Sequence, residues 1–373
     1  MKLYTVGGAV RDALLGLPAT DRDWVAVGAT PEALLALGYK PVGRDFPVFL
    51  HPQTHEEVAL ARTERKTAPG YHGFVFHADP GVTLEQDLAR RDLTINAMAR
   101  DEHGALIDPF GGAQDLADGV LRHVSDAFAE DPVRLLRVAR FAARFHRFMV
   151  APQTRALLRR IVDAGELDAL VPERVWQELS RGLMEARPSR MWALLLEVGA
   201  LTRLMPELNN TDSSNLHETR PQVLDRCAAA HAPLALRFAC LARAASSPAA
   251  LAQRLRAPKD CEALAVMLAR EAPALLEAPL PAADAVVQRL ERCDAWRRPE
   301  RFQELLLALQ CELPSWAAGA DWSAALAAAL TIDTTAVAQA AAAQGARGPA
   351  IGSAIQHARI EAVAVGCKQC ARK

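Results

Sequence analysis

The sequence predicts an N-terminal α/β domain followed by helical domains, and three observations support this fold class. Short apolar runs of strand type, broken by Gly and Pro, fill residues 1–125. Apolar residues recur at helical spacing over 131–205 and again over 220–373, where Ala, Leu and Arg dominate. The chain has 373 residues, which is enough for two or three domains with a sizeable core.

The predicted elements follow in order along the chain. Strand-like runs are expected at 3–6, 24–27, 48–50 and 58–61, with a helix at 9–15 between the first two. Domain boundaries are expected at Ser125–Asp131 and in the polar stretch Asn209–Arg220. The predicted domains are therefore 1–128, 129–205 and 206–373.

The composition is that of a globular protein and limits its partners. Charged residues make up 23%, the apolar set 51%, and the formal net charge is −1, so any nucleic-acid surface has to be local. No stretch reaches the roughly 18 apolar residues of a membrane span, and the first strand runs into Gly7-Gly8 without room for a signal peptide. Seven scattered cysteines favour reduced thiols in a cytoplasmic protein. Cys367 and Cys370 have no second CxxC, so we expect a tail there rather than a metal or redox site. No feature specifies an oligomeric state.

The first candidate site is the turn between the first strand and the first helix. Two glycines, Gly7 and Gly8, let backbone N–H groups approach a phosphate closely, and the N-terminus of a helix favours an anion. Arg11 lies one turn into this helix, within reach of the same phosphate. A plain tight turn is the alternative, because the pattern is neither GxGxxG nor a Walker loop.

Acidic residues on the next strands form the second candidate site. Asp21 and Asp23 are two residues apart in an expected strand, so their side chains share one face, about 7 Å apart along the backbone. Two such carboxylates repel unless a divalent cation lies between them and a ligand phosphate. Glu57 opens a later strand-like run and could complete a two-metal cluster, although Glu56 beside it is equally acidic. A solvated strand end is the alternative for the aspartate pair.

Arginines dominate the third candidate region. Arg91, with Arg90, offers charge for a triphosphate, and Asp92 offers an acceptor for a ribose hydroxyl. Asp131 precedes Pro132 and suits a helix N-cap, a structural role that is sufficient by itself. After it, arginines recur every three or four residues on one helical face: Arg134, Arg137, Arg140, Arg144 and Arg147. Five aligned arginines favour a binding surface over a solvated face.

Together these residues resemble the class II CCA-adding enzymes, the bacterial tRNA nucleotidyltransferases, and most closely the proteobacterial branch of multifunctional CCA proteins. The matching segments are 6–12, 21–24, 43–66, 90–97 and 130–140, with further similarity at 172–176 and 294–299. The likeness is dense over 1–205 and patchy beyond. It implies a polymerase-β-type nucleotidyltransferase head followed by all-α neck, body and tail domains.

The resemblance also implies a reaction and residue roles. Such enzymes add CTP, CTP and ATP to the tRNA 3′ end without a nucleic-acid template, releasing pyrophosphate. Asp21 and Asp23 are implied to hold Mg²⁺, and the role of Glu57 as a third catalytic carboxylate stays open. The implied nucleotide-binding residues are Gly8, Arg11, Arg91, Asp92 at the ribose, Asp131 and Arg134 at the base edge, Arg137 and Arg140. The segment 62–80 resembles the mobile loop of the family.

One departure from the family limits the expected activities. Longer members of this branch carry an HD phosphohydrolase domain marked by a His-Asp pair, but Arg243-Ala244 stands where His-Asp is expected, and the chain has no His-Asp dipeptide. We therefore expect no phosphatase or phosphodiesterase activity.

Three other functions stay open. They are a poly(A) polymerase, a partial enzyme that adds only C or only A, and a catalytically silent RNA-binding protein.

Overall fold

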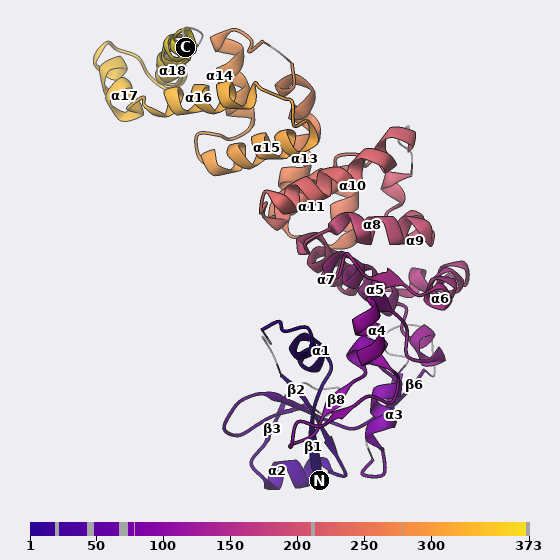
Figure 1. Ribbon diagram of the computed structural model, residues 1–373. Helices are drawn as coiled ribbons and strands as arrows, with labels where there is room; N and C mark the ends of the chain where they lie inside the picture. The colour runs from indigo at the N-terminus through magenta and orange to yellow at the C-terminus, as the bar shows by residue number, and fades with distance from the viewer. Residues whose placement is uncertain are drawn as a thin grey trace. The chain divides into compact units, whose positions relative to one another are not determined.

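The computed structural model describes residues 1–18, 22–42, 48–66, 74–77, 79–209, 213–277 and 279–370. It divides into two compact units, Met1–Pro206 and Glu207–Lys373 (Figure 1). The first unit contains a mixed β-sheet and helices, and the described part of the second is helical. The predicted fold class, an α/β head followed by helical domains, is confirmed. The further division between residues 128 and 129 stays a prediction.

The main sheet of the first unit is mixed. In the described part of the chain its strands run in the order β3-β4-β5-β2-β1-β8-β9. They are β1 (Lys2–Val6), β2 (Asp23–Val27), β3 (Lys40–Val42), β4 (Val48–Leu50), β5 (Glu57–Leu60), β8 (Ala99–Arg100) and β9 (Leu106–Ile107). The central strand β2 pairs antiparallel with β1 and parallel with β5. Two smaller pairs accompany the sheet: β6 (Thr63–Lys66) with β7 (Phe74–His77), and β10 (Val120–Leu121) with β11 (Met149–Val150).

Both faces of the sheet are covered by apolar side chains, because successive residues of a strand point to opposite sides. Val25 belongs to a cluster with Val6 and with Leu88 of α3 (Leu84–Ala89). The next residue, Ala26, belongs to a cluster on the other side with Leu34 of α2 (Pro31–Ala36). Asp23 precedes Val25 by two residues and therefore emerges on the α3 side of the sheet.

The remaining helices of the first unit follow and flank the sheet. They are α1 (Gly8–Leu14), α4 (Gly112–Asp118), α5 (Val133–Arg144), α6 (Pro152–Asp163), α7 (Pro172–Met184), α8 (Pro188–Glu197) and α9 (Ala200–Leu204). Four 3₁₀ turns among the described residues are η2 (Thr94–Asn96), η3 (Asp126–Glu130), η4 (Glu166–Ala169) and η5 (Pro206–Leu208). Helix α5 packs against both α7 and α8. This packing brings polar residues of α7 next to the arginines of α5.

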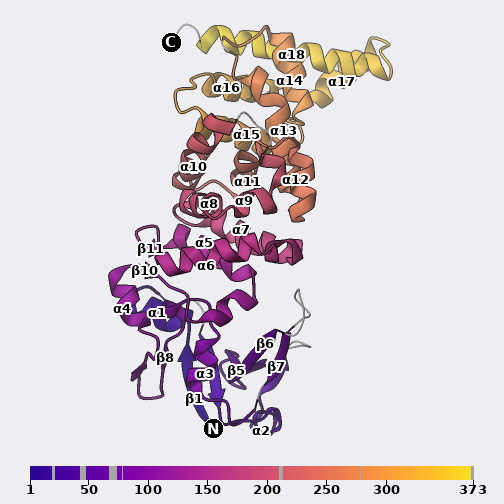
Figure 2. The same ribbon diagram turned by 90° about the vertical axis from the view of Figure 1, so that its right-hand side faces the viewer.

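The second unit is built from α10 (Ser213–Ala229), α11 (Leu234–Ala242), α12 (Pro248–Leu255), α13 (Lys259–Leu275), α14 (Ala283–Arg292), α15 (Pro299–Glu312), α16 (Gly319–Leu330), α17 (Thr334–Ala343) and α18 (Pro349–Cys370). Helix α11 packs on α13, and the long helix α18 packs against α14, α16 and α17 (Figure 2). Within the described ranges, no single helix is long and apolar enough to cross a bilayer, and one bent pair, α16 with α17, passes that test by length and composition only.

Candidate active site

The predicted glycine turn joins β1 to α1. Gly7 has a φ of 70°, in the left-handed region that favours glycine. A Cβ atom at Gly7 would lie 2.9 Å from Nη1 of Arg91, so the absent side chain leaves room for that guanidinium. Nε of Arg91 is buried and has no hydrogen-bond partner among the described residues, although Nη2 lies 3.2 Å from Asp87. The guanidinium of Arg91 is therefore held beside the turn by Asp87.

Strand register brings two of the predicted carboxylates together. Asp23 pairs with Glu57 across the parallel strands β2 and β5, which lie about 4.8 Å apart in such pairing. The alternative acid, Glu56, accepts a hydrogen bond from Nε1 of Trp24 at 3.0 Å and belongs to a different environment. Asp21 lies outside the described residues, so its predicted partnership with Asp23 stays a prediction.

The carboxylate pair fits the implied cation. Ionised Asp and Glu oxygens are the ligands that Mg²⁺ prefers, and Mg²⁺ commonly takes one or two protein carboxylates together with substrate phosphates. Among the described residues there is no group of three or more His, Cys, Asp or Glu side chains placed to hold a metal. Asp23 and Glu57 could supply two ligands to a divalent cation, and any further ligand would come from another group.

A cavity of about 740 Å³ contains every predicted site residue that the structure describes. Those residues are Gly8, Arg11, Asp23, Glu57, Arg91, Asp92, Asp131, Arg134, Arg137 and Arg140. The volume lies within the range of small-molecule sites, roughly 300–1,000 Å³. Counted over the described residues, its lining has ten arginines and six carboxylates. The surplus of positive charge suits a polyanionic ligand such as a triphosphate.

The arginines of α5 lie largely as the sequence predicted. Arg134, Arg137, Arg140 and Arg144 all line the cavity. Helix α5 ends at Arg144, so Arg147 lies beyond it and the stripe has four of the five predicted arginines.

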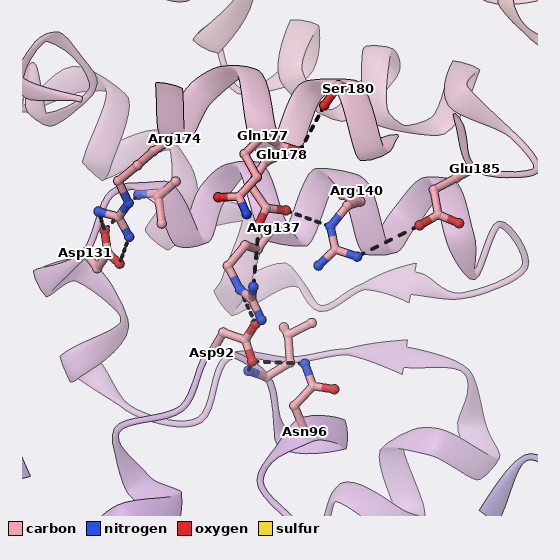
Figure 3. Close-up of polar contacts among 12 residues, drawn as sticks. Asp92, Asn96, Asp131, Arg137, Arg140, Arg174, Gln177, Glu178, Ser180 and Glu185 are labelled. Carbon is pink, nitrogen blue, oxygen red and sulfur yellow. Dashed lines mark hydrogen bonds and ion pairs between the residues drawn. The ribbon is translucent and has the colours of Figure 1, made fainter. Parts of the chain in front are cut away.

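A chain of charged contacts links α5 to the head and to α7 (Figure 3). Nε of Arg137 donates to Oδ2 of Asp92 at 2.8 Å, and its Nη1 lies 3.5 Å from Oε1 of Glu178. Nε of Arg140 donates to Oε2 of the same Glu178 at 2.6 Å. Asp92 also accepts a bond from Nδ2 of Asn96 at 2.9 Å. This network fixes the positions of Arg137 and Arg140, and the carboxylates of Asp92 and Glu178 neutralise part of their charge.

The network shifts the pKa values of its members. Burial alone would raise the pKa of Asp92, but the charge of Arg137 and hydrogen bonds from Asn96, Arg137 and the Leu93 N–H outweigh it, so the pKa lies well below its usual range. The pKa of Arg137 is raised, first by the charge of Asp92 and against the effect of burial. Both groups are therefore ionised at neutral pH.

Arg11 is more deeply engaged than the sequence predicted. Its side chain is 4% exposed, its Nε donates to Oδ1 of Asp12 at 2.9 Å, and its Nη1 donates to Asn96. The guanidinium also lies over the rings of Phe141 and Phe145 of α5, 5.3 Å from each centroid. Arg11 thereby connects α1 to α5, and its predicted contact with a nucleotide stays a prediction.

Asp131 caps the start of α5, as predicted. Its backbone is extended with φ −117°, its Oδ1 accepts from the Val133 N–H at 3.2 Å, and Pro132 after it has helical dihedrals with φ −60°. The assigned helix begins at Val133, one residue later than expected.

The carboxylate of Asp131 is held by an arginine that the sequence analysis did not assign. Arg174 of α7 donates from Nη1 to Oδ1 at 3.1 Å and from Nη2 to Oδ2 at 2.8 Å. Arg134, the predicted second base-edge residue, donates from Nη1 to the Ala127 carbonyl at 2.9 Å.

Sequence reasoning assigned no role to Arg174, Glu178 and Asn96, which line the cavity. Arg174 and Glu178 are four residues apart on one helix face, and Asn96 follows Asp92 by four. This spacing could have indicated that each pair faces the same space. Arg144 was noted only as part of the arginine stripe, but its Nη2 lies 3.1 Å from Oδ2 of Asp12 and adds a second link between α5 and α1.

Carboxylates that suit a divalent cation lie beside donors that suit a triphosphate, and both lie at one end of a mixed sheet. This arrangement is typical of nucleotidyl transfer and puts the chain in the nucleotidyltransferase class. Residues 3–122 match the family model of the poly A polymerase head domain, and residues 147–211 match that of the probable RNA and SrmB-binding site of polymerase A.

Relatives identify the branch of this class. The chain is 54% identical to the multifunctional CCA protein of Leptothrix cholodnii, over 98% of this chain and 96% of the relative, and 54% identical to that of Azoarcus sp., over 92% of each. Among solved structures, an apo form of a CCA-adding enzyme is 26% identical with a TM-score of 0.72, over 97% of this chain and 88% of that one. The chain belongs to the multifunctional CCA protein family of CCA-adding tRNA nucleotidyltransferases.

Proposed function

We propose that the chain builds the sequence CCA on the 3′ end of tRNA from CTP and ATP, without a nucleic-acid template and with release of pyrophosphate. The observation that carries this proposal is the in-register pairing of Asp23 with Glu57 at the wall of an arginine-rich cavity. The reaction needs carboxylates and cationic groups within reach of one triphosphate, and the cavity has both.

Asp23, Asp21 and Glu57 are the proposed ligands of Mg²⁺. When bound, two such ions stabilise the attacking 3′-hydroxyl oxygen and the leaving pyrophosphate oxygen of an in-line displacement. The protein contributes the geometry: parallel strands hold Asp23 and Glu57 side by side, and the sheet keeps their spacing.

The triphosphate is proposed to lie along the glycine turn and the arginines around it. Gly8 is the first residue of α1, so its backbone N–H lies at the helix N-terminus, whereas the Gly7 N–H already donates to the Met98 carbonyl at 3.2 Å. The guanidinium of Arg91 lies beside this turn. Arg137 and Arg140, held by Glu178, supply additional fixed charge. Fixed donors of this kind stabilise charge that moves onto the leaving group, at little reorganisation cost.

Base selection is proposed to rest on Asp131 and Arg134. A carboxylate accepts from the exocyclic amine of C or A and a guanidinium donates to ring acceptors, whereas U and G present a carbonyl at the same position. A carboxylate has about four lone-pair positions, so Asp131 can accept from a base amine while both oxygens keep their bonds to Arg174. Asp92 is proposed to accept from the ribose.

We propose that the chain lacks phosphohydrolase activity. Arg243, at the position where His-Asp is expected, directly follows the last residue of α11, and its Nε lies 3.7 Å from Oε2 of Glu312. A cationic side chain at this position opposes the binding of a catalytic cation.

The experiment that tests the proposed function is extension of a tRNA transcript that ends at the discriminator base, resolved to single nucleotides. Each nucleotide is supplied singly, then CTP with ATP, in Mg²⁺, with Asp21→Ala and Asp23→Ala variants as controls. We expect growth by C, then C, then A, and then a stop. Continued A addition would identify a poly(A) polymerase, a stop after two C residues a partial enzyme, and no extension a silent RNA-binding protein.

A further inference from the structure

A second cavity lies in the C-terminal unit and shares no lining residue with the candidate active site. It has a volume of about 480 Å³ and lies between α14, the segment that follows α14, the start of α17 and the first half of α18. Helix α18 packs against α14 and α17, and residues such as Gly352 and Ser353 on its surface leave the space between them open. The family model matches do not extend to this region.

A stacked pair of side chains forms one wall of this cavity. The guanidinium carbon of Arg359 lies 4.1 Å from the ring centroid of Trp296, well within cation–π range. Nε of Arg359 is buried and has no acceptor in the part of the chain that the structure describes. Burial lowers the pKa of this guanidinium, partly offset by the charge of Glu291. The wall is therefore a flat cation–π surface, and its buried Nε is not accessible to a ligand.

The rest of the lining indicates the chemistry of a ligand. Thr334, Ser353 and Gln356 place hydrogen-bonding side chains around the same space. The one carboxylate among the described lining residues, Glu291, balances the one guanidinium, so the cavity lacks the positive surplus that a phosphate needs. A neutral, planar group with hydrogen-bonding atoms on its edge fits a flat wall beside these polar side chains. Nucleobases have this chemistry, and they stack on aromatic and guanidinium planes when unpaired.

We propose that this cavity binds an unpaired nucleobase of the RNA substrate, which stacks on the Trp296–Arg359 wall and forms hydrogen bonds along its edge with the polar side chains Thr334, Ser353 and Gln356. The inference rests on the proposed function, because it takes the polymer substrate to be an RNA with unpaired bases. It makes the C-terminal unit a base-reading surface as well as a helical support.

Three variants test the proposal. Trp296→Ala removes the stacking wall. Gly352→Leu fills the cavity and leaves the wall intact, since a Cβ at Gly352 meets no atom within 4 Å. His357→Ala is the matched control: this residue is on the same helix but outside the cavity, with a side chain that is 74% exposed. Thermal melting of each variant establishes that it is folded.

The readout is equilibrium binding to two probes: a tRNA transcript that ends at the discriminator base, and a blunt RNA duplex without unpaired bases. Loss of one base-stacking contact predicts about tenfold weaker tRNA binding by Trp296→Ala and Gly352→Leu, with duplex binding and the control variant unchanged. Unchanged tRNA binding by a folded Gly352→Leu variant overturns the proposal, and so does an equal loss for both probes. Failure of the wild-type chain to extend the transcript would instead refute the proposed function, because the affinity comparison does not depend on catalysis.

Discussion

The two hydrogen bonds from Arg174 to Asp131 predict that the proposed base selection by Asp131 depends on a residue of a different helix. Arg174 donates to both oxygens of the carboxylate, at 3.1 and 2.8 Å, and so determines the plane in which Asp131 faces the cavity. The substitution Arg174→Gln keeps a polar side chain of similar length but removes the charge and the paired donors. We expect it to let Asp131 rotate away from the base edge.

The magnitude follows from the two bonds and their exposure. Hydrogen bonds to charged groups contribute roughly 1.5–3 kcal/mol each. The side chains of Arg174 and Asp131 are 26% and 17% exposed, so solvent screening brings the pair to the lower end of that range. If about 2 kcal/mol of transition-state stabilisation is lost because Asp131 is no longer oriented, kcat/KM for CTP and for ATP falls about 30-fold.

The assay compares kcat/KM for CTP, ATP, UTP and GTP on one tRNA transcript. Arg181→Gln is the matched control, since Arg181 is on the same helix and lines the same cavity but makes no recorded contact with Asp131 among the described residues. We expect Arg174→Gln to lower the preference for C and A over U and G, and Arg181→Gln to keep it. If both variants retain wild-type selectivity, the orientation of Asp131 does not depend on Arg174 and the reasoning is refuted.

Three further predictions concern the metal ligands, the charged network and the packing of the head. Asp23→Ala should abolish addition of both C and A while circular dichroism and melting stay near wild type, and retained turnover would move the metal site elsewhere. The pKa of Asp92 is lower in the folded chain than in the unfolded chain, so the ionised carboxylate stabilises the fold by an amount on the order of 3 kcal/mol. This stabilisation is complete above the unfolded pKa near 4 and is lost as the pH falls through the folded pKa. Urea unfolding should therefore show a gap between wild type and Asp92→Asn that is constant from pH 7 to 5 and shrinks below pH 4; a gap independent of pH would contradict this. Gly112→Ala should lower the free energy of unfolding by about 2–3 kcal/mol, because its Cβ would lie 2.2 Å from the Thr94 carbonyl oxygen. Gly352→Ala, with no atom within 4 Å, is the control, and equal stability of the two variants would contradict the packing argument.

The sequence by itself determined the fold class and most members of the active-site cavity. Local signals were sufficient there: a strand that ends in Gly7-Gly8, an aspartate at the start of β2, and arginines every three or four residues along α5. Each depends on the period of a single strand or helix, which is readable over a few residues.

Only the tertiary structure determined which of these side chains lie close enough to interact. Register between β2 and β5 distinguishes Glu57, opposite Asp23, from the equally acidic Glu56, and a shift by one residue would exchange them. The partner of Asp131 is 43 residues away on α7, brought there by the packing of α7 on α5. Contacts of this kind depend on the relative position of separate elements, which burial of their apolar faces determines and which no local pattern in the sequence specifies.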